Sequence, residues 1–201
     1  IKLYSKQDDR IKPVFLKDNL GPAMARNKAI SIAKGRYIAF LDSDDVWLPN
    51  KLKLQIDFMQ LNNYSFVFSS YDVVSQDRSE VLYSVSVPNK ISYKQYLKNT
   101  IIGCLTVVID TKKYKDVRMP DLRSSHDMAL WLDLLRGGNY AYGLNLNLAK
   151  YRQVKSSNTS NKLKAAYDVW NVYRYYEKLS LINSSINFVF YSINAMLKRL
   201  F

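Results

Sequence analysis

The sequence predicts an α/β protein with a mainly parallel sheet, and the evidence lies in its first forty or so residues. Residues 11–16 are apolar but interrupted by Pro13, which is typical of an edge strand, and residues 37–41 are a run of apolar and aromatic β-formers. Residues 23–34 between them have helical propensity and apolar spacing. A strand, a helix and a second strand in this order predict a parallel sheet that binds ligands beyond the carboxyl ends of its strands.

Turn and cap residues delimit the elements around this unit. Pro22 suits the first position of the first helix, and we expect Gly35 to be its C-cap. Pro49 begins a second helix that runs to about Leu61. Its apolar face is expected to consist of Leu52, Ile56 and Met59.

The rest of the chain alternates between strand and helix patterns. Ser92 and Gln95 form a capping box for a short helix that ends at Lys98. A longer helix is expected at residues 126–136, closed by two glycines. Strands are expected at residues 64–70, 81–87, 100–110 with a glycine break, and 140–152. Loops are expected at residues 112–125 and 153–161.

The composition indicates a globular protein with one main domain. Of its 201 residues, 48% are hydrophobic and 23% are charged, which is enough apolar material for a sizeable core. The single cysteine, Cys104, excludes an internal disulfide, and with one histidine, His126, there is no Cys/His zinc site. Because the sequence starts at Ile1 without an initiator Met or a signal segment, we expect a fragment whose beginning is missing.

The net charge of +13 is concentrated toward the carboxyl terminus. Residues 134–201 contain ten Lys and Arg, against only two acidic residues, Asp168 and Glu177. A basic region of this kind can meet nucleic acid, anionic lipid or an acidic substrate. Composition alone leaves these three possibilities open.

A helical tail, residues 162–201, is expected to follow a catalytic domain of residues 1–161. Residues 162–179 are helical, aromatic and basic, and residues 181–201 form an amphipathic helix. We define its apolar stripe as Ile182, Ile186, Val189, Phe190, Ile193, Met196, Leu197 and Leu200. About seven polar residues in this stretch argue against a membrane span, whereas Lys198 and Arg199 at its end fit an interfacial anchor. Equally open is the alternative that the stripe packs on the domain or on a second subunit.

Three carboxylates, Asp42, Asp44 and Asp45, follow the strand at residues 37–41. Alternate residues of a strand point to the same side, so Asp42 and Asp44 can project together. Two or three oxygens are too few to cage Mg²⁺ or Mn²⁺, which takes its other ligands from water and from substrate phosphates. The pattern therefore indicates a metal-bridged diphosphate. The alternative is a polar turn that caps the next helix.

Several motifs, in this order and spacing, resemble the core of the family 2 glycosyltransferases over about residues 7–160. They are Asn19-Leu20-Gly21 to Ala25-Arg26-Asn27, Ala33 to Asp45, Trp47 with Pro49 and Lys51-Leu52, His126-Asp127 before Leu130-Trp131-Leu132, and Tyr151-Arg152. The resemblance implies a GT-A fold, which is a Rossmann-like, mixed and mainly parallel sheet flanked by helices. It also implies a nucleotide-activated donor and inversion at the anomeric carbon. The tail resembles bacterial capsule and teichuronic-acid-type members.

The resemblance also implies roles for individual residues. Asp44 is the first choice for direct contact with Mn²⁺ or Mg²⁺, with Asp42 and Asp45 as further candidates. Arg26 and Arg152 would bind the donor diphosphate, and Asp127 would be the base that deprotonates the acceptor. Residues 155–160 resemble a segment that closes over bound donor, and Trp131 is expected in the core.

These assignments have alternatives. Asp127 also suits the first turn of a helix on electrostatic grounds alone, and Arg26 could be a solvated helix arginine. His126 departs from the family, whose members commonly carry an acidic residue there. A lone histidine near a helix start is more often exposed or already paired, so we assign it no role.

The expected function is transfer of a sugar from a nucleotide diphosphate donor, UDP-linked, to a lipid-linked or polysaccharide acceptor in bacterial surface-polysaccharide synthesis. The protein is expected to be cytoplasmic and bound at the inner face of the plasma membrane, an anionic surface, without nucleic acid. Relatives begin with a strand that holds the nucleotide base, so this chain by itself is expected to bind donor poorly or not at all. The alternatives are a non-catalytic membrane-surface scaffold and a basic nucleic-acid-binding module.

Overall fold

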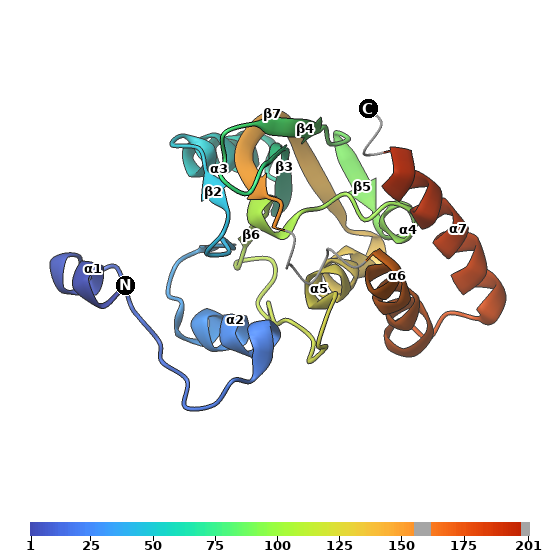
Figure 1. Ribbon diagram of the computed structural model, residues 1–201, viewed down its shortest axis with the longest axis horizontal. Helices are drawn as coiled ribbons and strands as arrows, with labels where there is room; N and C mark the ends of the chain where they lie inside the picture. Colours follow the sequence, from blue (N-terminus) through green and yellow to red (C-terminus); the bar gives the residue numbers. More distant parts are fainter. Residues whose placement is uncertain (155–161, 198–201) are drawn as a thin grey trace.

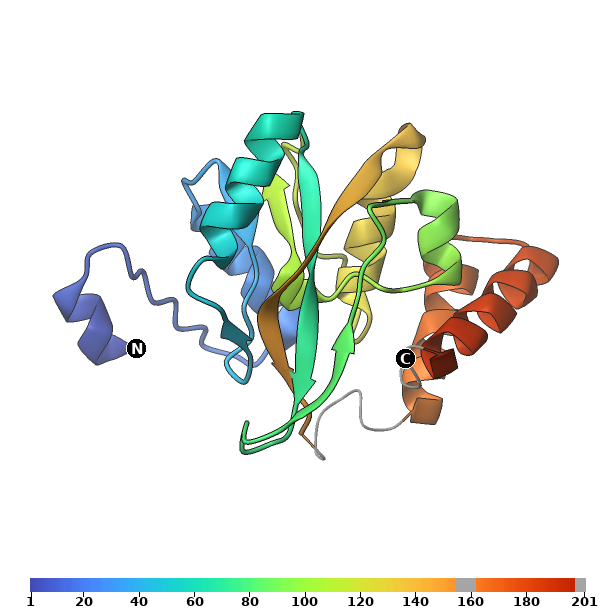
Figure 2. The same cartoon turned by 90° about the horizontal axis from the view of Figure 1, so that it is seen from above.

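The fold is built around β3 (Phe66–Val74), a nine-residue strand in which every residue except Asp72 is buried. The computed structural model describes residues 1–154 and 162–197. It shows β3 within a curved sheet that has helices on both faces (Figures 1 and 2). Consecutive β3 residues face opposite sides, as the strand geometry requires. Phe66 and Phe68 belong to the larger core, and Val67 belongs to a smaller core on the other face.

The sheet is mixed, with strand order β1-β6-β3-β7-β2. The strands of this path are β1 (Tyr37–Ala39), β6 (Val108–Asp110), β3, β7 (Tyr140–Arg152) and β2 (Val46–Trp47). In addition, β4 (Val81–Val85) pairs with β3, and β5 (Lys90–Ser92) pairs with β7. The predicted α/β class is confirmed, but the sheet is not mainly parallel. Among the described strands only β3 and β7 pair in parallel.

Most of the predicted helices are present. They are α2 (Gly21–Ile32), α3 (Lys51–Asn62), α4 (Tyr93–Lys98), α5 (His126–Leu135), α6 (Lys162–Asn171) and α7 (Leu181–Leu197). A six-residue α1 (Lys2–Gln7), two short 3₁₀ turns (Cys104–Thr106 and Arg136–Gly138) and a π-helical turn after α6 (Val172–Tyr176) complete the list. The capping box of Ser92 and Gln95 is present as predicted. None of the described helices is both long and apolar enough to cross a membrane.

The predicted first strand is wrong. Residues 11–16 are irregular and exposed, with Phe15 66% exposed, and they pair with no strand in the described part of the chain. An apolar segment forms a strand only where a partner satisfies its backbone groups. The first helix ends at Ile32 with Ala33 as an extended C-cap, so Gly35 is not the cap.

Two predicted strands are shorter than expected. β1 stops at Ala39 and its residues are half-buried, although Phe40 after it is buried. The segment 100–110 yields only a 3₁₀ turn and the three residues of β6. The strands β2 and β5, of two and three residues, gave no pattern in the sequence because such short elements depend on their partner β7.

The larger core joins the sheet to α5. Trp131 is fully buried, as predicted, and its ring meets Phe66 and Phe40 at centroid distances of 5.5 and 5.8 Å. The helical tail adds Val169 and Val172 to the same core. On the opposite face, α3 covers Val67 and Val108 through Met59.

The buried face of α3 differs from the predicted one. Met59 is buried as expected, but Leu52 is 40% exposed, and the positions one and two turns before Met59 are the polar residues Lys51 and Gln55, each at most 1% exposed. Periodicity predicted an apolar buried face because it takes no account of whether buried polar side chains find hydrogen-bond partners.

The partners of these buried polar groups explain their position. Lys51 Nζ donates to Gln55 Oε1 at 2.6 Å and lies 4.5 Å from the centroid of the Trp47 ring. Gln55 Nε2 donates to the carbonyl of Thr106 at 2.8 Å. Buried polar groups are tolerated when they are paired in this way. Among residues 1–154 and 162–197 no carboxylate forms an ion pair with this ammonium, and burial lowers the pKa of Lys51 to about 7.

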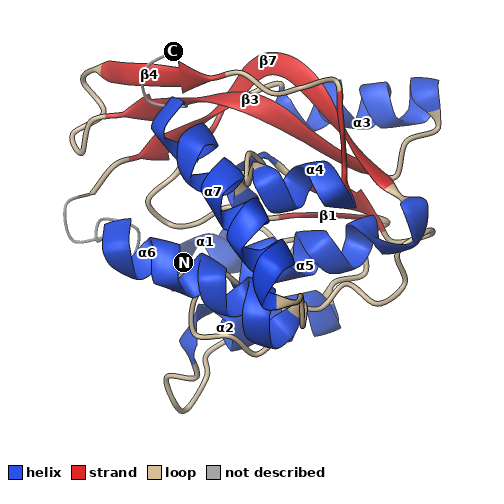
Figure 3. Ribbon diagram, turned by 90° about the vertical axis from the view of Figure 1, so that its right-hand side faces the viewer, coloured by secondary structure: helices blue, strands red, loops and turns tan. Residues whose placement is uncertain are grey.

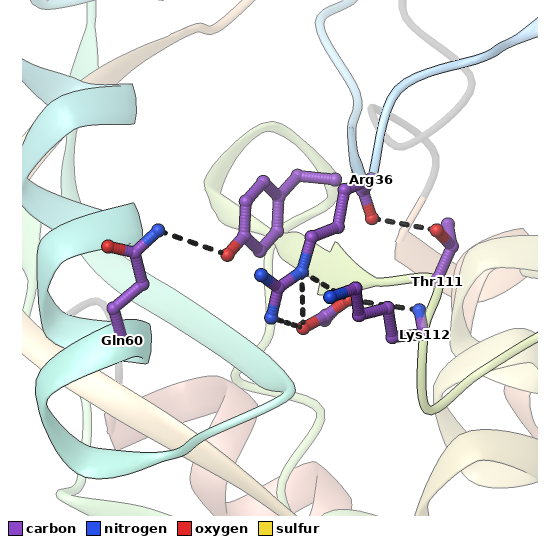
Figure 4. A network of polar contacts seen from close by, with 6 residues as sticks. Arg36, Gln60, Thr111 and Lys112 are labelled. Atoms are coloured by element: carbon purple, nitrogen blue, oxygen red, sulfur yellow. Dashed lines mark hydrogen bonds and ion pairs between the residues drawn. The ribbon is translucent and has the colours of Figure 1, made fainter.

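A second polar network fixes the start of β1 against the end of β6 (Figure 4). The Arg36 guanidinium lies 2.7 Å from Asp110 Oδ2, and the backbone N–H of Lys112 donates to Asp110 Oδ1 at 2.9 Å. Thr111 Oγ1 donates to the Arg36 carbonyl at 2.8 Å. Hydrogen bonding to Arg36 holds the pKa of Asp110 below its usual range. The short strand β1 is therefore secured by side chains as well as by its ladder.

We predict that Lys51 makes stability rise with pH. Its lowered pKa means that the unfolded chain binds more protons than the folded one between about pH 7 and 10.5, and stability rises with pH wherever that holds. Between pH 7 and 9 the free energy of unfolding should increase by about 1–3 kcal/mol more in the unchanged chain than in Lys51→Met. Denaturant unfolding at each pH measures this difference. Lys53→Met, an exposed position on the same helix, is the control, and parallel curves for the unchanged chain and Lys51→Met would contradict the prediction.

Candidate functional site

The three carboxylates form the turn between β1 and β2. The backbone N–H of Asp45 donates to the carbonyl of Asp42 at 3.1 Å, which closes a four-residue turn. Since β1 and β3 both pair antiparallel to β6, they run in the same direction, as does β7. The turn therefore lies at the carboxyl end of β1, as predicted. It does not cap the next helix, because the N-cap of α3 is Asn50.

One of these carboxylates contacts α2 and, through it, α5. Arg26 Nη2 donates to Asp42 Oδ1, and Arg26 Nη1 lies 2.5 Å from His126 Nε2. The guanidinium can only donate hydrogen bonds, so Nε2 must be the acceptor and the His126 proton is on Nδ1. The Arg26 side chain is 19% exposed, which excludes the alternative that Arg26 is a solvated arginine on the helix surface. Segments 16 and 100 residues away from Arg26 thus meet at one guanidinium.

The electrostatics of His126 agree with this arrangement. Burial lowers the pKa of His126, the Asp127 carboxylate opposes that effect, and the Arg26 charge adds to it. A neutral imidazole accepts from Arg26 without cancelling its charge. His126 is 7% exposed and paired, so it is not the exposed residue that the sequence also allowed. Its partner could not be found in the sequence, because nothing in the local pattern connects α5 with α2.

Asp127 lies in the first turn of α5, where the helix N-terminus favours a carboxylate. The residue before this helix, Ser125, has a left-handed backbone with φ of 54° and ψ of 24°, and its side chain makes no capping hydrogen bond. Left-handed serine is uncommon, and such conformations persist only where surrounding contacts impose them. Buried His126 and its bond to Arg26 supply such contacts. Asp127 also acts electrostatically on Cys104, whose thiol pKa is raised by burial.

Arg152 joins the turn from the end of β7. The β2–β7 ladder aligns Val46 with Lys150, and the backbone N–H of Arg152 donates to Asp45 Oδ1 at 3.1 Å. Burial raises the pKa of Asp45 to about 6 despite this bond. The Arg152 Nε is buried and has no hydrogen-bond partner among the described residues. Arg152 and the turn are thus brought together as predicted, through the backbone.

The fit of the turn to a divalent cation is partial. Asp44 is half-buried, and its carboxylate has no hydrogen-bond or ion-pair partner within the described chain, which leaves both oxygens available. Asp42 already contacts Arg26, and Asp45 is tied to Arg152. No group of three or more acidic, histidine or cysteine side chains in residues 1–154 and 162–197 is arranged to hold a metal ion. The donor type suits Mg²⁺ or Mn²⁺, with most ligands coming from a bound diphosphate and water.

One predicted part of the site is not described. The segment 155–160, which the resemblance places over bound donor, lies outside the described residues. The remaining predicted residues, Arg26, the carboxylates of the turn, Asp127 and Arg152, come from four separate elements of the chain: α2, the β1–β2 turn, α5 and β7.

Comparison with known proteins identifies the family. Residues 1–111 match the family described as Glycosyl transferase family 2. A Bacillus subtilis protein, TuaG, named as a teichuronic acid biosynthesis glycosyltransferase, is 46% identical over 200 residues, covering all of this chain and 79% of its own length. The chain belongs to glycosyl transferase family 2. Another relative, WfgD of Escherichia coli, is 40% identical over 172 residues, which are 85% of this chain and 67% of WfgD. WfgD is named as a UDP-Glc:alpha-D-GlcNAc-diphosphoundecaprenol beta-1,3-glucosyltransferase.

Solved structures confirm the GT-A fold of this glycosyltransferase. The crystal structure of Staphylococcus aureus TarS in complex with UDP-GlcNAc superposes with a TM-score of 0.65 at 20% identity. The superposition covers 86% of this chain and 51% of the TarS chain. The chain therefore spans about half the length of that structure.

We predict that both neighbours of His126 tune its pKa, in opposite directions. The chain has one histidine, so its imidazole NMR signals titrate without overlap. The pKa should lie below that of a free imidazole, rise in Arg26→Met, which loses a positive charge, and fall in Asp127→Asn, which loses a negative one. Arg10→Met, at an exposed arginine near the amino terminus, should leave it unchanged. An unchanged pKa in Arg26→Met would contradict the observed contact.

Proposed function

We propose that this family 2 glycosyltransferase transfers a sugar from a UDP-linked donor, with inversion, to a lipid-linked or polysaccharide acceptor in bacterial surface-polysaccharide synthesis. The observation that carries the proposal is the junction of Arg26 with Asp42 and His126, next to Asp127, at the carboxyl end of β1. The printed names of relatives support the substrate classes: teichuronic acid for TuaG, UDP-glucose and a diphosphoundecaprenol acceptor for WfgD, and UDP-GlcNAc for TarS.

The donor side of the reaction would be served by the turn and its two arginines. Negative charge builds up on the departing diphosphate, and a divalent cation supplies charge neutralisation at that point. Asp44, whose carboxylate has no partner among the described residues, would hold such a cation first, with Asp42 as second ligand and Asp45 as a further candidate. Arg26, whose guanidinium contacts Asp42 and His126, would present its charge to the diphosphate, and Arg152 would add a second positive charge.

The acceptor side would be served by Asp127. An inverting displacement needs the acceptor hydroxyl to lose its proton as it attacks, and a carboxylate within hydrogen-bond reach can take that proton. Asp127 is half-buried at the helix N-terminus, beside a histidine that is kept neutral by burial and by Arg26. His126 Nε2 already accepts a hydrogen bond from Arg26, so the imidazole does not compete with Asp127 as a base for the same proton.

The first test of this function is binding of UDP. Calorimetric titration, using the chain preceded by any upstream residues that its gene encodes, should show UDP binding that depends on Mn²⁺. Asp44→Asn should weaken it by about tenfold or more, because one of few protein ligands is lost. Asp57→Asn, at an exposed aspartate on α3, is the matched control. Equal binding of UDP with and without Mn²⁺, or none in either case, would contradict the proposal and favour a non-catalytic scaffold.

We further propose that α7 holds the enzyme at an anionic membrane surface, the inner face of the plasma membrane, where a lipid-linked acceptor is presented. α7 packs on α4 and α6 through the face that carries Ser184, Phe188 and Tyr191 (Figure 3). The described residues of the apolar stripe lie on the other face and are between 43% and 72% exposed. Much of the surface of the stripe is therefore left uncovered by the described part of the domain, which supports a partner outside it.

Charge next to the stripe favours lipid over a second subunit. The Lys98 ammonium lies 4.8 Å from the centroid of the Phe190 ring, so a cation adjoins the apolar surface itself. Apolar residues flanked by lysine are typical of helices that lie in a membrane interface. Lys198 and Arg199, which the sequence places at the end of this helix, lie outside the described residues.

This membrane proposal is tested by sedimentation with vesicles. The protein should bind vesicles that contain phosphatidylglycerol more strongly than neutral ones, and high salt should weaken binding. Ile186→Glu, which places a charge in the stripe, should reduce the partition coefficient by about tenfold. Leu61→Glu, at a more exposed apolar residue on α3, should have no effect. Vesicle binding that survives Ile186→Glu would contradict the proposal.

A further inference from the structure

A cavity of about 570 Å³ lies between the loop before α5 and the outer side of α6 and the π-helical turn. The loop contributes Arg123 and Ser124. The helical side contributes Tyr167, Asp168, Asn171 and Tyr175. Its volume is within the range of small-molecule binding sites, and none of the groups proposed to bind the donor lines it.

Two tyrosine rings of this cavity are unusually exposed. Tyr167 is 63% exposed and Tyr175 is 75% exposed, although both belong to the segment whose opposite side enters the main core through Val169 and Val172. A tyrosine combines a large apolar ring face with a polar tip. Sugars offer the matching chemistry, because a pyranose ring has apolar C–H faces and hydroxyl groups at its edge.

The polar groups of the cavity also suit a neutral saccharide. Asn171 lines the cavity, and its side-chain amide can exchange a hydrogen bond with a sugar hydroxyl. Charged lining residues are one arginine and one aspartate, Arg123 and Asp168, so the cavity has no excess of positive charge for a diphosphate.

The walls of the cavity are fixed relative to α5. Tyr176 Oη, at the end of the π-helical turn, donates to Asp133 Oδ2 at 2.5 Å, and Glu177 contacts Arg136 at 2.6 Å. Ser124 precedes Asp127 by three residues, so their Cα atoms lie within about 11 Å of each other. A saccharide seated here is therefore near the residue proposed to deprotonate the acceptor.

We propose that this cavity binds a sugar unit of the acceptor, with Tyr167 and Tyr175 against the ring faces and the Asn171 amide hydrogen-bonded to a sugar hydroxyl. The inference rests on the proposed function and names the acceptor subsite within it. The donor approaches Asp127 from the side of α2 and the β1–β2 turn, and the acceptor sugar approaches from the side of α6.

Direct binding tests the subsite without catalysis. Saturation-transfer NMR with N-acetylglucosamine, glucose and galactose as probes should show contact for at least one of them. Tyr167→Ala and Tyr175→Ala should each weaken that binding by about five- to tenfold, because an aromatic contact is lost, whereas Tyr167→Phe and Tyr175→Phe, which keep the ring, should retain it. Tyr4→Ala is the matched control, since Tyr4 is also 63% exposed but lies on α1. Absence of binding for all three sugars, or binding that the alanine variants do not change, would overturn the proposal.

A second measurement separates the subsite from the donor site. With a GlcNAc-diphospholipid acceptor and UDP-glucose, the alanine variants should raise the KM for acceptor and leave the KM for donor and the affinity for UDP unchanged. A raised donor KM would overturn the assignment to the acceptor. If UDP binding fails while the tyrosine-dependent sugar signals are present, the proposed donor chemistry fails and the saccharide site stands.

Discussion

The buried strand β3 is the constraint on which the rest of the structure depends. Its backbone groups are out of reach of water, so both of its edges must be paired within the protein. β6 and β4 share one edge, and β7 occupies the other. β6 in turn pairs with β1 and so sets the direction of that short strand. As a result the carboxyl ends of β1 and β7 meet, and Arg152 contacts the turn of the three carboxylates.

Within the candidate site, the guanidinium of Arg26 connects separate elements, as β3 does in the sheet. It joins Asp42 to His126 and is shielded from water on most of its surface. A carboxylate in place of His126 would neutralise part of this arginine's charge, whereas a neutral imidazole accepts a hydrogen bond without doing so. If Arg26 binds the donor diphosphate as proposed, a histidine at this position would leave it more charge for that contact.

Features with local causes were predictable from the sequence. The capping box of Ser92 and the helix that begins at His126 follow from neighbouring residues, whereas the roles of the candidate site residues were predicted from motifs that resemble the family. Features that depend on distant partners were not. Residues 11–16 have the local pattern of a strand, yet no partner pairs with them in the described chain. The burial of Lys51 depends on the ring of Trp47 and on a carbonyl in another element, and the contact between His126 and Arg26 spans 100 residues of sequence.

In the helical tail, each helix packs one side on the domain and leaves the other side exposed. α6 and the π-helical turn send Val169 and Val172 into the core and leave Tyr167 and Tyr175 outside, whereas α7 packs through a partly polar face and leaves its apolar stripe outside. Exposing large apolar side chains is unfavourable unless something covers them. A lipid-linked saccharide has two chemically different parts, a sugar and a hydrocarbon chain in a membrane. Tyrosines suit the first and the apolar stripe suits the second, so an acceptor of the proposed kind would account for both exposed surfaces.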